Sequence, residues 1–557
     1  MEDCLKLKKS NCKNCYKCIR NCPVKSIRFS DNQAHIVKDE CVLCGMCFVS
    51  CPQNAKEVRN DVGYAKELLK SGRPVYASVA PSFAANYEGV TISMMDAALK
   101  KLGFCGAEET AIGATIVKKE YEDILAGKKP SVLISSCCHT VNTLIQKYYP
   151  EALPYLAKVK SPMQAHCMEI KRVHKDACTV FIGPCISKKD EAQKYPGITD
   201  CVLTFEELSA WMEEAGVEFC DLPDETNTGR SRLFPTAGGI IRSMDLADDI
   251  DYIVIDGMDN CMAALEDIRD GHLKNCFVEM SACKGSCIGG PVMSRARTNP
   301  VRDFVAVNRY AGTGDLPVHR PDAEQVAKAF PFEGAKKQMP GSAAIKEILA
   351  KMGKHSEKDE LNCGTCGYNT CREKAIAVFM GKADLSMCLP FLKEKAENFS
   401  DTIINNTPNG ILVLNEQLET QQINRAACDI LDVKRPEDVL GTPVIRILDP
   451  TDYLAVMDSG QNVYEKRKYL AEYKKYVEET IIYDKEYHII MSITKDITDQ
   501  QEILESKEKQ SRQAVEITDK VVEKQMRVVQ EIASLLGETA AETKIALTKL
   551  KETLEDE

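Results

Sequence analysis

The sequence predicts a multidomain protein of mixed α/β and α+β class, and three observations support this. The chain has 557 residues, more than one hydrophobic core usually serves. Between Gly72 and Arg320, short apolar runs such as Val75–Val79 and Thr179–Ile182 alternate with helical stretches, as expected for a buried parallel sheet. Finally, many of the 26 cysteines fall into spaced groups, which divide the chain into segments.

The composition narrows the class of function. The net charge is −11 and no basic stretch dominates any segment, so we expect no nucleic-acid partner. No run approaches the roughly 18 apolar residues of a membrane helix, and the N-terminus lacks an apolar signal core. We therefore expect a cytoplasmic chain without a membrane partner. Cysteines in that compartment stay reduced and more often bind metals than form disulfides.

Residues 1–60 contain a tandem cysteine pattern. Each half reads C-x2-C-x2-C-x3-C-P, a register in which three cysteines hold one 4Fe–4S cluster and the fourth crosses to the other. Zinc also takes four thiolates, but eight cysteines in this double register favour iron–sulfur clusters. The segment resembles bacterial two-cluster ferredoxins, which carry single electrons, and is called the ferredoxin module below. The expected ligands are Cys12, Cys15, Cys18 and Cys51 for cluster one, and Cys41, Cys44, Cys47 and Cys22 for cluster two.

Three loops of the central region, residues 72–320, carry further cysteines, and each loop follows an apolar strand. They are Ser135–His139, Gly183–Glu191 and Glu279–Gly290. Loops at the carboxyl ends of parallel strands converge on one crevice. Helices that start directly after the first two loops would point their N-termini at that crevice, which favours an anionic cofactor.

In their order along the chain, these loops resemble the signature segments of FeFe hydrogenases, which read roughly TSCCPxW, PCxxKxxE and MACxxGCxxGGG. The resemblance implies an H-cluster, a 4Fe–4S cluster joined to a two-iron unit with carbonyl, cyanide and dithiolate ligands. Cys137 matches the cysteine that exchanges protons with the dithiolate amine, and Lys188 matches a cyanide-binding lysine. Pro81 and Ser82 match the segment at the other cyanide. The implied cluster ligands are Cys138, Cys185, Cys283 and Cys287, of which Cys287 also bridges to the two-iron unit.

The sequence also departs from this family pattern. Residues around a metal site tune its potential and proton access, so we expect an altered site. His139 is either a substitute proton relay or simply a polar residue at a helix start. The segment Ile116–Glu122 reads IVKKEYE, with lysines where the family has an acidic proton channel, which puts that channel in doubt. The departures in the loops are His139, Val141, Gly183, Ser281 and Pro291.

Several cysteines lie outside these patterns. Cys4 precedes the ferredoxin register and is expected to be a free thiol. Seven others in the central region lack ligand spacing and sit among apolar residues, so we expect all of them to be buried. They are Cys105, Cys167, Cys178, Cys201, Cys220, Cys261 and Cys276.

A third group of cysteines lies in residues 355–392, called the four-cysteine domain below. It resembles the small iron–sulfur domain found with corrinoid proteins and electron-transport subunits, which implies another 4Fe–4S cluster; zinc is the alternative. From its place in the chain, we expect it to lead electrons from the catalytic region toward the C-terminus, away from the ferredoxin side. The ligands would be Cys363, Cys366, Cys371 and Cys388.

Residues 396–500 resemble a PAS domain, both in the opening with Asn424 ahead of an Ala pair and in the exit Asp496–Thr498. No haem or flavin ligand pattern is present, and a plain dimerisation module is the alternative. Residues 501–557 should form one helix whose apolar seam spans nearly five heptads, which predicts a coiled-coil homodimer. A solitary amphipathic helix is the alternative. The seam is Val522, Met526, Val529, Ala533, Leu536, Ala540, Thr543, Leu547, Leu550 and Leu554.

Three hypotheses for the function follow. The first is a sensory FeFe hydrogenase that acts reversibly on H₂ and protons. Its redox state would pass through 4Fe–4S clusters to the PAS domain and coiled coil, which act on a separate kinase or phosphatase partner. The second is an ordinary catalytic hydrogenase that works with ferredoxin or another redox protein. The third is a non-catalytic hydrogenase-like redox or assembly protein, although Lys188 and Ala80–Ser82 have no purpose without cyanide.

Overall fold

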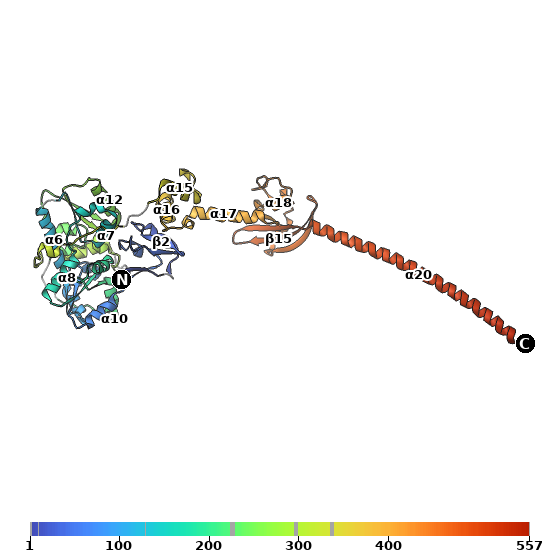
Figure 1. Ribbon diagram of the computed structural model, residues 1–557, viewed down its shortest axis with the longest axis horizontal. Helices are drawn as coiled ribbons and strands as arrows, with labels where there is room; N and C mark the ends of the chain where they lie inside the picture. Colours follow the sequence, from blue (N-terminus) through green and yellow to red (C-terminus); the bar gives the residue numbers. More distant parts are fainter. Residues whose placement is uncertain are drawn as a thin grey trace. The chain divides into compact units, whose positions relative to one another are not determined.

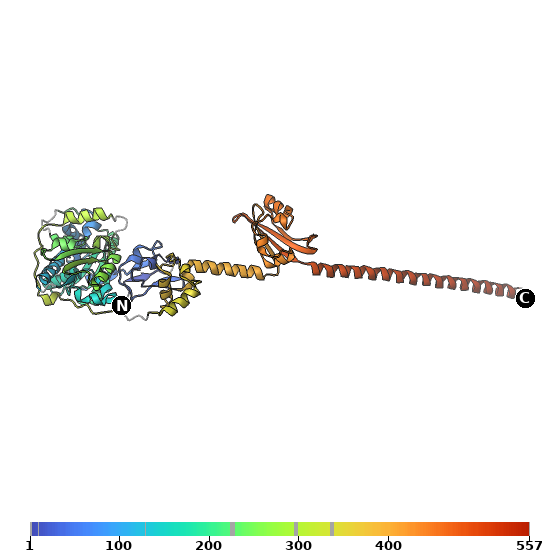
Figure 2. The ribbon, with the colours of Figure 1, turned by 90° about the horizontal axis from the view of Figure 1, so that it is seen from above.

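The computed structural model describes residues 3–8, 11–127, 130–222, 229–293, 299–334 and 339–555. It divides into two compact units, Met1–Leu392 and Lys393–Glu557. Figures 1 and 2 show the ribbon of both units. All three cysteine-rich segments belong to the first unit, and the PAS-like segment and the long helix belong to the second.

The ferredoxin module consists of two short antiparallel strand pairs and two single-turn helices. Helix α1 carries Cys18 and helix α2 carries Cys47, so each helix begins inside a group of three closely spaced cysteines. The pairs are β1 (Leu5–Leu7) with β4 (Lys56–Val58) and β2 (Ile27–Ser30) with β3 (Gln33–Ile36); the helices are α1 (Lys17–Arg20) and α2 (Met46–Val49).

The central region has the predicted α/β architecture, but it holds two parallel sheets rather than the single one expected. Alternating strands and helices predict parallel pairing without specifying which strands are neighbours, which is why the division was missed. One sheet has the order β6-β5-β8-β9 and the other β10-β11-β7. Their strands are β5 (Val75–Val79), β6 (Gly106–Glu109), β7 (Val132–Ile134), β8 (Cys178–Gly183), β9 (Cys201–Thr204), β10 (Asp251–Asp256) and β11 (Cys276–Ser281).

Helices cover these sheets and bury them. Strands β8 and β11 are buried along their whole length, as expected for central strands covered on both faces. The helices are α3 (Val62–Lys70), α4 (Phe83–Asn86), α5 (Ile92–Lys101), α6 (Ala111–Ala126), α7 (His139–Tyr148), α8 (Pro162–Val173), α9 (Ser187–Lys194), α10 (Phe205–Glu214), α11 (Gly239–Ser243), α12 (Met258–Arg269), α13 (Pro300–Tyr310) and α14 (Ala323–Val326).

The expectation that seven cysteines of this region are buried was right for five and wrong for two. Cys105 and Cys220 are exposed, because Cys105 lies in the turn before the edge strand β6 and Cys220 lies in an irregular segment. Cys220 accepts a hydrogen bond from Lys101 at 2.9 Å. Cys4 is buried against Ile186 and Val292 of the central region.

The four-cysteine domain completes the first unit. It follows helix α15 (Ser342–Lys351) and contains α16 (Cys371–Phe379) and the start of α17 (Leu389–Asn406). Leu349 of α15 and Met352 directly after it pack with Ala375 and Cys388, so a small core joins α15 to this domain.

The second unit contains a five-stranded antiparallel sheet in the order β13-β12-β16-β15-β14. Asn424 fixes its opening, because its buried side chain accepts hydrogen bonds from the N–H groups of Ile411 and Ala427 at 2.8 and 2.9 Å. Its amide donates to the carbonyl oxygens of Ile404 and Asn409. The elements are β12 (Gly410–Asn415), β13 (Thr420–Ile423), α18 (Arg425–Ile430), α19 (Thr451–Ser459), β14 (Val463–Leu470), β15 (Lys475–Asp484) and β16 (Ile489–Asp496).

A single helix, α20 (Thr498–Glu555), follows the sheet. The hydroxyl of Thr498 donates to Asp496 at 2.6 Å and the Thr498 N–H donates to the same carboxylate, which closes the turn between strand and helix. Within the described ranges, no helix combines the length and the apolar character needed to cross a bilayer.

Candidate functional site

Loops from both sheets of the central region meet at one cavity of about 110 Å³. Each loop lies at the carboxyl end of a parallel strand, namely β5, β7, β8 and β11, which is where ligands bind in such folds. The structure therefore brings together side chains that are far apart in sequence. Those from the predicted site that line the cavity are Pro81, Ser82, Cys137, Cys138, Cys185, Lys188 and Cys287.

Cys283 lies beside this cavity. Burial raises the pKa of its thiol well above the ordinary value, and the thiols of Cys185, Cys138 and Cys287 raise it further. The four implied cluster ligands are therefore within electrostatic reach of one another. Thiolate sulfurs in such a group are the ligands that 4Fe–4S clusters use.

Lys188 is held by a buried ion network. Its ammonium lies 2.5 Å from Glu191 and donates to the Cys137 carbonyl at 3.2 Å. Burial alone would lower the pKa of Lys188, but Glu191 reverses this and the pKa is raised, so the side chain is a fixed cation. Lys328 also donates to Glu191, at 2.5 Å, and to Gln164 at 2.8 Å. Sequence reasoning missed Lys328, which lies 137 residues beyond Glu191.

Two buried polar atoms at the cavity lack a hydrogen-bond partner within the described part of the chain. They are the Ser82 hydroxyl and Nδ1 of His139. A buried polar atom without a partner is costly, so each is suited to pair with a bound group. A hydroxyl and a fixed cation at a thiol-lined cavity match what anionic cyanide ligands need. The residues present thus fit an H-cluster.

His139 starts helix α7, and its other ring nitrogen is hydrogen-bonded to Asp190 at 2.9 Å. Burial lowers the pKa of His139, and Asp190 opposes this. The helix-start position agrees with the simpler of the two roles considered above, and the relay role stays a prediction.

Cys137 lies beside Tyr121. The Tyr121 hydroxyl is 3.3 Å from the Cys137 thiol and also accepts the Ser136 N–H at 2.8 Å. Burial raises the pKa of Cys137 to about 12, so the thiol is protonated near neutral pH. Tyr121 belongs to the segment in which acidic residues were expected. Of the two lysines in that segment, Lys118 does not line the cavity and instead donates a hydrogen bond to the Ser243 carbonyl at 2.7 Å.

Glu279 lines the same cavity and had no assigned role. Burial raises its pKa to about 7, although backbone N–H groups at the start of α11, including that of Ile241, lower it. A carboxyl group with a pKa near neutrality at the wall of such a cavity is able to exchange protons. Its position within β11, four residues before Cys283, was the only sequence signal.

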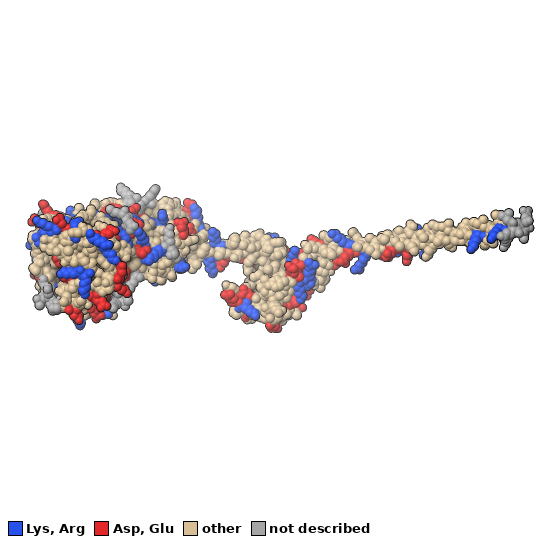
Figure 3. All heavy atoms as spheres, turned by 90° about the horizontal axis from the view of Figure 1, so that it is seen from below, with Lys and Arg blue, Asp and Glu red and all other residues tan. Residues whose placement is uncertain are grey.

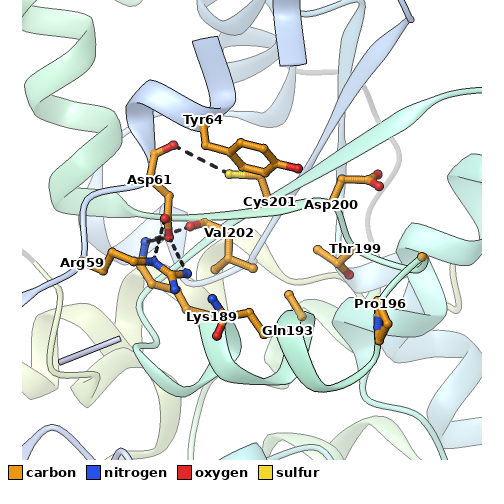
Figure 4. Close-up of a pocket in the computed structure, with 12 residues that line it drawn as sticks. Arg59, Asp61, Tyr64, Lys189, Gln193, Pro196, Thr199, Asp200, Cys201 and Val202 are labelled. Carbon is orange, nitrogen blue, oxygen red and sulfur yellow. Dashed lines mark hydrogen bonds and ion pairs between the residues drawn. The ribbon is translucent and has the colours of Figure 1, made fainter. Parts of the chain in front are cut away.

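Lys189 has a different role from its neighbour Lys188. Figure 4 shows its side chain directed at Asp61, which also binds Arg59, in a second cavity of the first unit. The Lys189 ammonium is 2.7 Å from Asp61 and 2.9 Å from Glu207. These contacts fasten the segment after the ferredoxin module to α9 and α10, so Lys189 supports the fold.

The remaining predicted ligands also come together. Burial raises the pKa of Cys18 to about 11, with contributions from Cys12, Cys15 and Cys51. Cys47 has Cys44, Cys41 and Cys22 as electrostatic neighbours. The last four line one cavity: Cys363, Cys366, Cys371 and Cys388. In the ranges that the structure describes, no group of three or more His, Cys, Asp or Glu side chains is arranged to hold a single metal ion.

The four-cysteine domain is packed against the ferredoxin module, contrary to the separation that its place in the chain suggested, and the expected electron route toward the C-terminus stays a prediction. Cys366, Tyr368 and Met387 share one hydrophobic core with Cys18 and Ile19 of the ferredoxin module. Figures 1 and 2 both show β2 beside α16. The order of segments along the chain carried no information about this docking.

Comparison with known proteins gives four family matches. Residues 73–291 match the C-terminal domain of the iron-only hydrogenase large subunit. Residues 34–57 match a 4Fe–4S binding domain, 359–390 a putative Fe–S cluster family and 398–472 the PAS fold.

Individual relatives are distant. The periplasmic Fe hydrogenase large subunit of Nitratidesulfovibrio vulgaris is 26% identical over 305 residues, 43% of this chain and 72% of that protein. Iron hydrogenase 1 of Clostridium pasteurianum is 25% identical over 39% of this chain and 48% of its own. The cytosolic Fe–S cluster assembly factor NAR1 of Yarrowia lipolytica is 27% identical over 36% of this chain. The matches span about half of the last two relatives' length.

Among solved structures, an FeFe-hydrogenase from Chlamydomonas reinhardtii is 18% identical with a TM-score of 0.40, covering 50% of this chain and all of its own. The fold, the cavity and the family matches define the class of protein: it is a hydrogenase-like iron–sulfur protein. More specifically, it is an FeFe-hydrogenase-like chain that also carries a PAS domain.

Proposed function

We propose that the chain is a sensory FeFe hydrogenase that interconverts H₂ with protons and electrons at an H-cluster bound by Cys138, Cys185, Cys283 and Cys287. The observation that carries this proposal is the cavity at which loops from two sheets bring together thiols, a fixed cation and a buried hydroxyl that has no partner among the described residues. The bound H-cluster would supply the metal centre that splits hydrogen.

The side chains around the cavity would divide the work. Lys188 and Ser82 would donate hydrogen bonds to the anionic cyanide ligands and so hold the two-iron unit in one orientation. Cys137, protonated near neutral pH, would hand protons to and from the cofactor. Tyr121 and Glu279 are placed to continue that route. Pro81, Met163 and Phe181 make part of the lining apolar, which would limit the access of bulk water.

The sensory part of the proposal rests on the second unit. Electrons would pass through the 4Fe–4S clusters of the ferredoxin module and the four-cysteine domain and alter the PAS domain and α20. A coiled-coil homodimer would carry the signal to a separate kinase or phosphatase partner. Ferredoxin or another redox protein would exchange electrons with the module. A cytoplasmic location stays a prediction, and the name of one relative places that protein in the periplasm.

A non-catalytic role is the second candidate, because the chain also matches assembly factors named NAR1. The altered residues His139 and Ser281 agree with such a role as well as with slow turnover. The Ser82 hydroxyl favours the hydrogenase, since it has no partner among the described residues and an assembly protein without a two-iron unit has no anionic ligand for it. Lys188 already binds Glu191 and therefore agrees with either role. An ordinary ferredoxin-linked hydrogenase would differ from the sensor in turnover rate and in the lack of a hydrogen effect on partner binding.

Hydrogen-dependent reduction of the clusters tests this function. The full chain, matured with the two-iron unit under anaerobic conditions, should lose its visible iron–sulfur absorbance under H₂ and keep it under argon. Lys188→Met should abolish the response, whereas Lys194→Met, on the same helix but paired with Glu333, should retain it. Equal absorbance under both gases, with all iron present, would contradict the proposal and favour the assembly role.

A further inference from the structure

We propose that the ferredoxin module is the junction through which the central hydrogenase-like region and the four-cysteine domain exchange electrons, with cluster two at the branch point. This inference relies on the cluster ligands proposed above but not on any hydrogen chemistry. It replaces the direct route from the catalytic region to the C-terminal side that the order of segments suggests.

One side of the cluster-two loop is docked on the central region. Gly45 lies so close to Pro291 that a Cβ there would be 2.6 Å from the proline Cβ. Lys147 of α7 donates to the Cys41 carbonyl at 2.9 Å, and Tyr148 donates to the Glu40 carbonyl at 2.6 Å. These contacts place cluster two against the region that holds the candidate H-cluster site.

Cys44 is the cysteine that faces this region. It packs into the same hydrophobic core as Cys138 and Met280, next to the site cavity. Its thiol also contributes to the raised pKa of Cys283, so the two predicted ligands of different clusters are electrostatic neighbours. Cluster two is thus the nearest predicted electron acceptor on this side.

The other side of the module is docked on the four-cysteine domain. Gly367 has a φ of +92°, and a Cβ at this residue would lie 3.0 Å from Ile19 of α1. The Phe29 N–H donates to the Lys382 carbonyl at 2.8 Å. Tyr368 and Met387 are almost fully buried in the shared core. A joint apolar core with backbone hydrogen bonds is the packing of a fixed interface.

Cys22, the crossing ligand of cluster two, lies at this interface. Lys25 donates to the carbonyls of Ile19, Arg20 and Gly367, at 3.2, 3.0 and 3.2 Å, and so ties both segments together. Both Cys22 and Cys366 act electrostatically on Lys25 and on Tyr368. One cysteine of cluster two therefore faces the central region and another faces the four-cysteine domain.

Cluster one would form the third branch. Its predicted ligand Cys15 is exposed, unlike Cys18, which is buried. An exposed ligand suits exchange with a separate redox protein. Electrons would move singly: cluster two loses one electron and the cluster of the four-cysteine domain gains it, with no bond made or broken.

Pulsed electron paramagnetic resonance on the full chain tests this order. All 4Fe–4S clusters are reconstituted, the two-iron unit is left out, and titanium(III) citrate is the reductant, so hydrogen chemistry plays no part. The signal of the four-cysteine domain is identified by its loss in Cys363→Ala. We expect the spin relaxation of that signal to be fast, because a neighbouring cluster carries a spin. The relaxation should slow several-fold in Cys41→Ala and stay unchanged in Cys15→Ala.

A second pair of variants keeps every cysteine. Gly367→Ala should disturb the docking and slow the relaxation, whereas Gly381→Ala, also at a positive φ but with open space around it, should not. An isolated signal in the unmodified chain, a coupling lost in Cys15→Ala instead of Cys41→Ala, or a spectrum unchanged by Cys363→Ala would each overturn the inference. None of these outcomes bears on whether the central region reacts with hydrogen.

Discussion

Single residues of the site were predictable where their spacing belongs to a local motif. The loop cysteines, Lys188 and Ser82 could all be named from the sequence, and all of them except Cys283 line one cavity in the structure. Tyr121 and Lys328 could not, because each reaches the site through the fold. Glu279 stands in the third signature loop, but its spacing from Cys283 did not mark it as a site residue. A tyrosine in a helix and a lysine in a connector carry no signal of a partner that is remote in sequence.

Lys328 is the first residue to test. Burial would raise the pKa of Glu191, but Lys188 and Lys328 hold it well below its ordinary value. Lys328→Met should therefore cost about 3 kcal/mol of unfolding free energy at pH 7, since it removes one partner of a buried carboxylate. Anaerobic denaturant titration measures this. Lys351→Met, which breaks an exposed pair with Glu347, should cost less than about 0.5 kcal/mol.

The same network predicts a pH dependence. A carboxylate with a depressed folded-state pKa adds stability above its unfolded pKa of about 4.3, and this is lost as the pH falls below that value. The difference between the unmodified chain and Lys328→Met should therefore shrink between pH 5 and pH 3. A difference that stays constant over this range would mean that Glu191 is not the group that Lys328 stabilises.

Tyr121 tests the proton route. Tyr121→Phe keeps the ring and removes the hydroxyl that contacts Cys137. We expect hydrogen–deuterium exchange between H₂ and D₂O to slow by at least tenfold, in the range of general acid–base effects, while infrared bands of the cofactor stay in place. Tyr252→Phe, which removes a hydroxyl that accepts the Ala247 N–H at the surface, is the control. An unchanged exchange rate would exclude Tyr121 from the route.

At the scale of helices, strands and loops, the contact between the loop at Gly45 and the loop at Pro291 fixes how the ferredoxin module docks on the central region. Gly45 and Gly72 have φ values of +76° and +78°, but only Gly45 has a neighbour within van der Waals distance. Gly72→Ala should cost about 1 kcal/mol for backbone strain alone, and Gly45→Ala should cost at least twice that because its Cβ meets Pro291. Thermal unfolding of both variants compares them, and equal costs would mean that the loop is not docked tightly.

The second feature at the scale of single elements is the apolar surface of helix α20. Its length and start were predictable from the scarcity of Gly and Pro and from Asp496–Thr498. The structure adds a second apolar stripe beside the predicted seam, formed by Val521, Val528, Ile532 and Leu535, all exposed. Figure 3 shows long uncharged stretches on this helix. A surface of this kind in one chain is expected to be covered by another helix.

The proposed coiled-coil dimer can be tested by measuring the molecular mass of the protein in solution. Leu536→Glu combined with Leu547→Glu places charge in the seam and should convert a dimer into a monomer in sedimentation velocity experiments. Lys524→Glu, at the outermost heptad position, should leave the dimer intact. A monomer before any substitution would contradict the coiled-coil proposal, and a larger assembly would assign the second stripe to further self-association.

At the scale of the whole molecule, the sequence defined the segments but not their neighbours. Local patterns identify a ferredoxin register, signature loops, a four-cysteine group and a PAS opening, because each depends on spacing within a few residues. The division into two sheets and the docking of the four-cysteine domain on the ferredoxin module depend on surfaces such as Ile19 and Tyr368 that no local pattern marks.

On the face seen in Figure 3, acidic and basic side chains of the first unit are interspersed.

The most direct test of the central claim is infrared spectroscopy of the anaerobically purified full chain, matured with the two-iron unit, with and without H₂. We expect carbonyl and cyanide bands that shift under H₂, because Lys188, Ser82 and the four cysteines would hold an H-cluster that responds to the gas. A spectrum without such bands, from protein with a full iron count for its other clusters, would contradict the claim and leave a non-catalytic iron–sulfur protein.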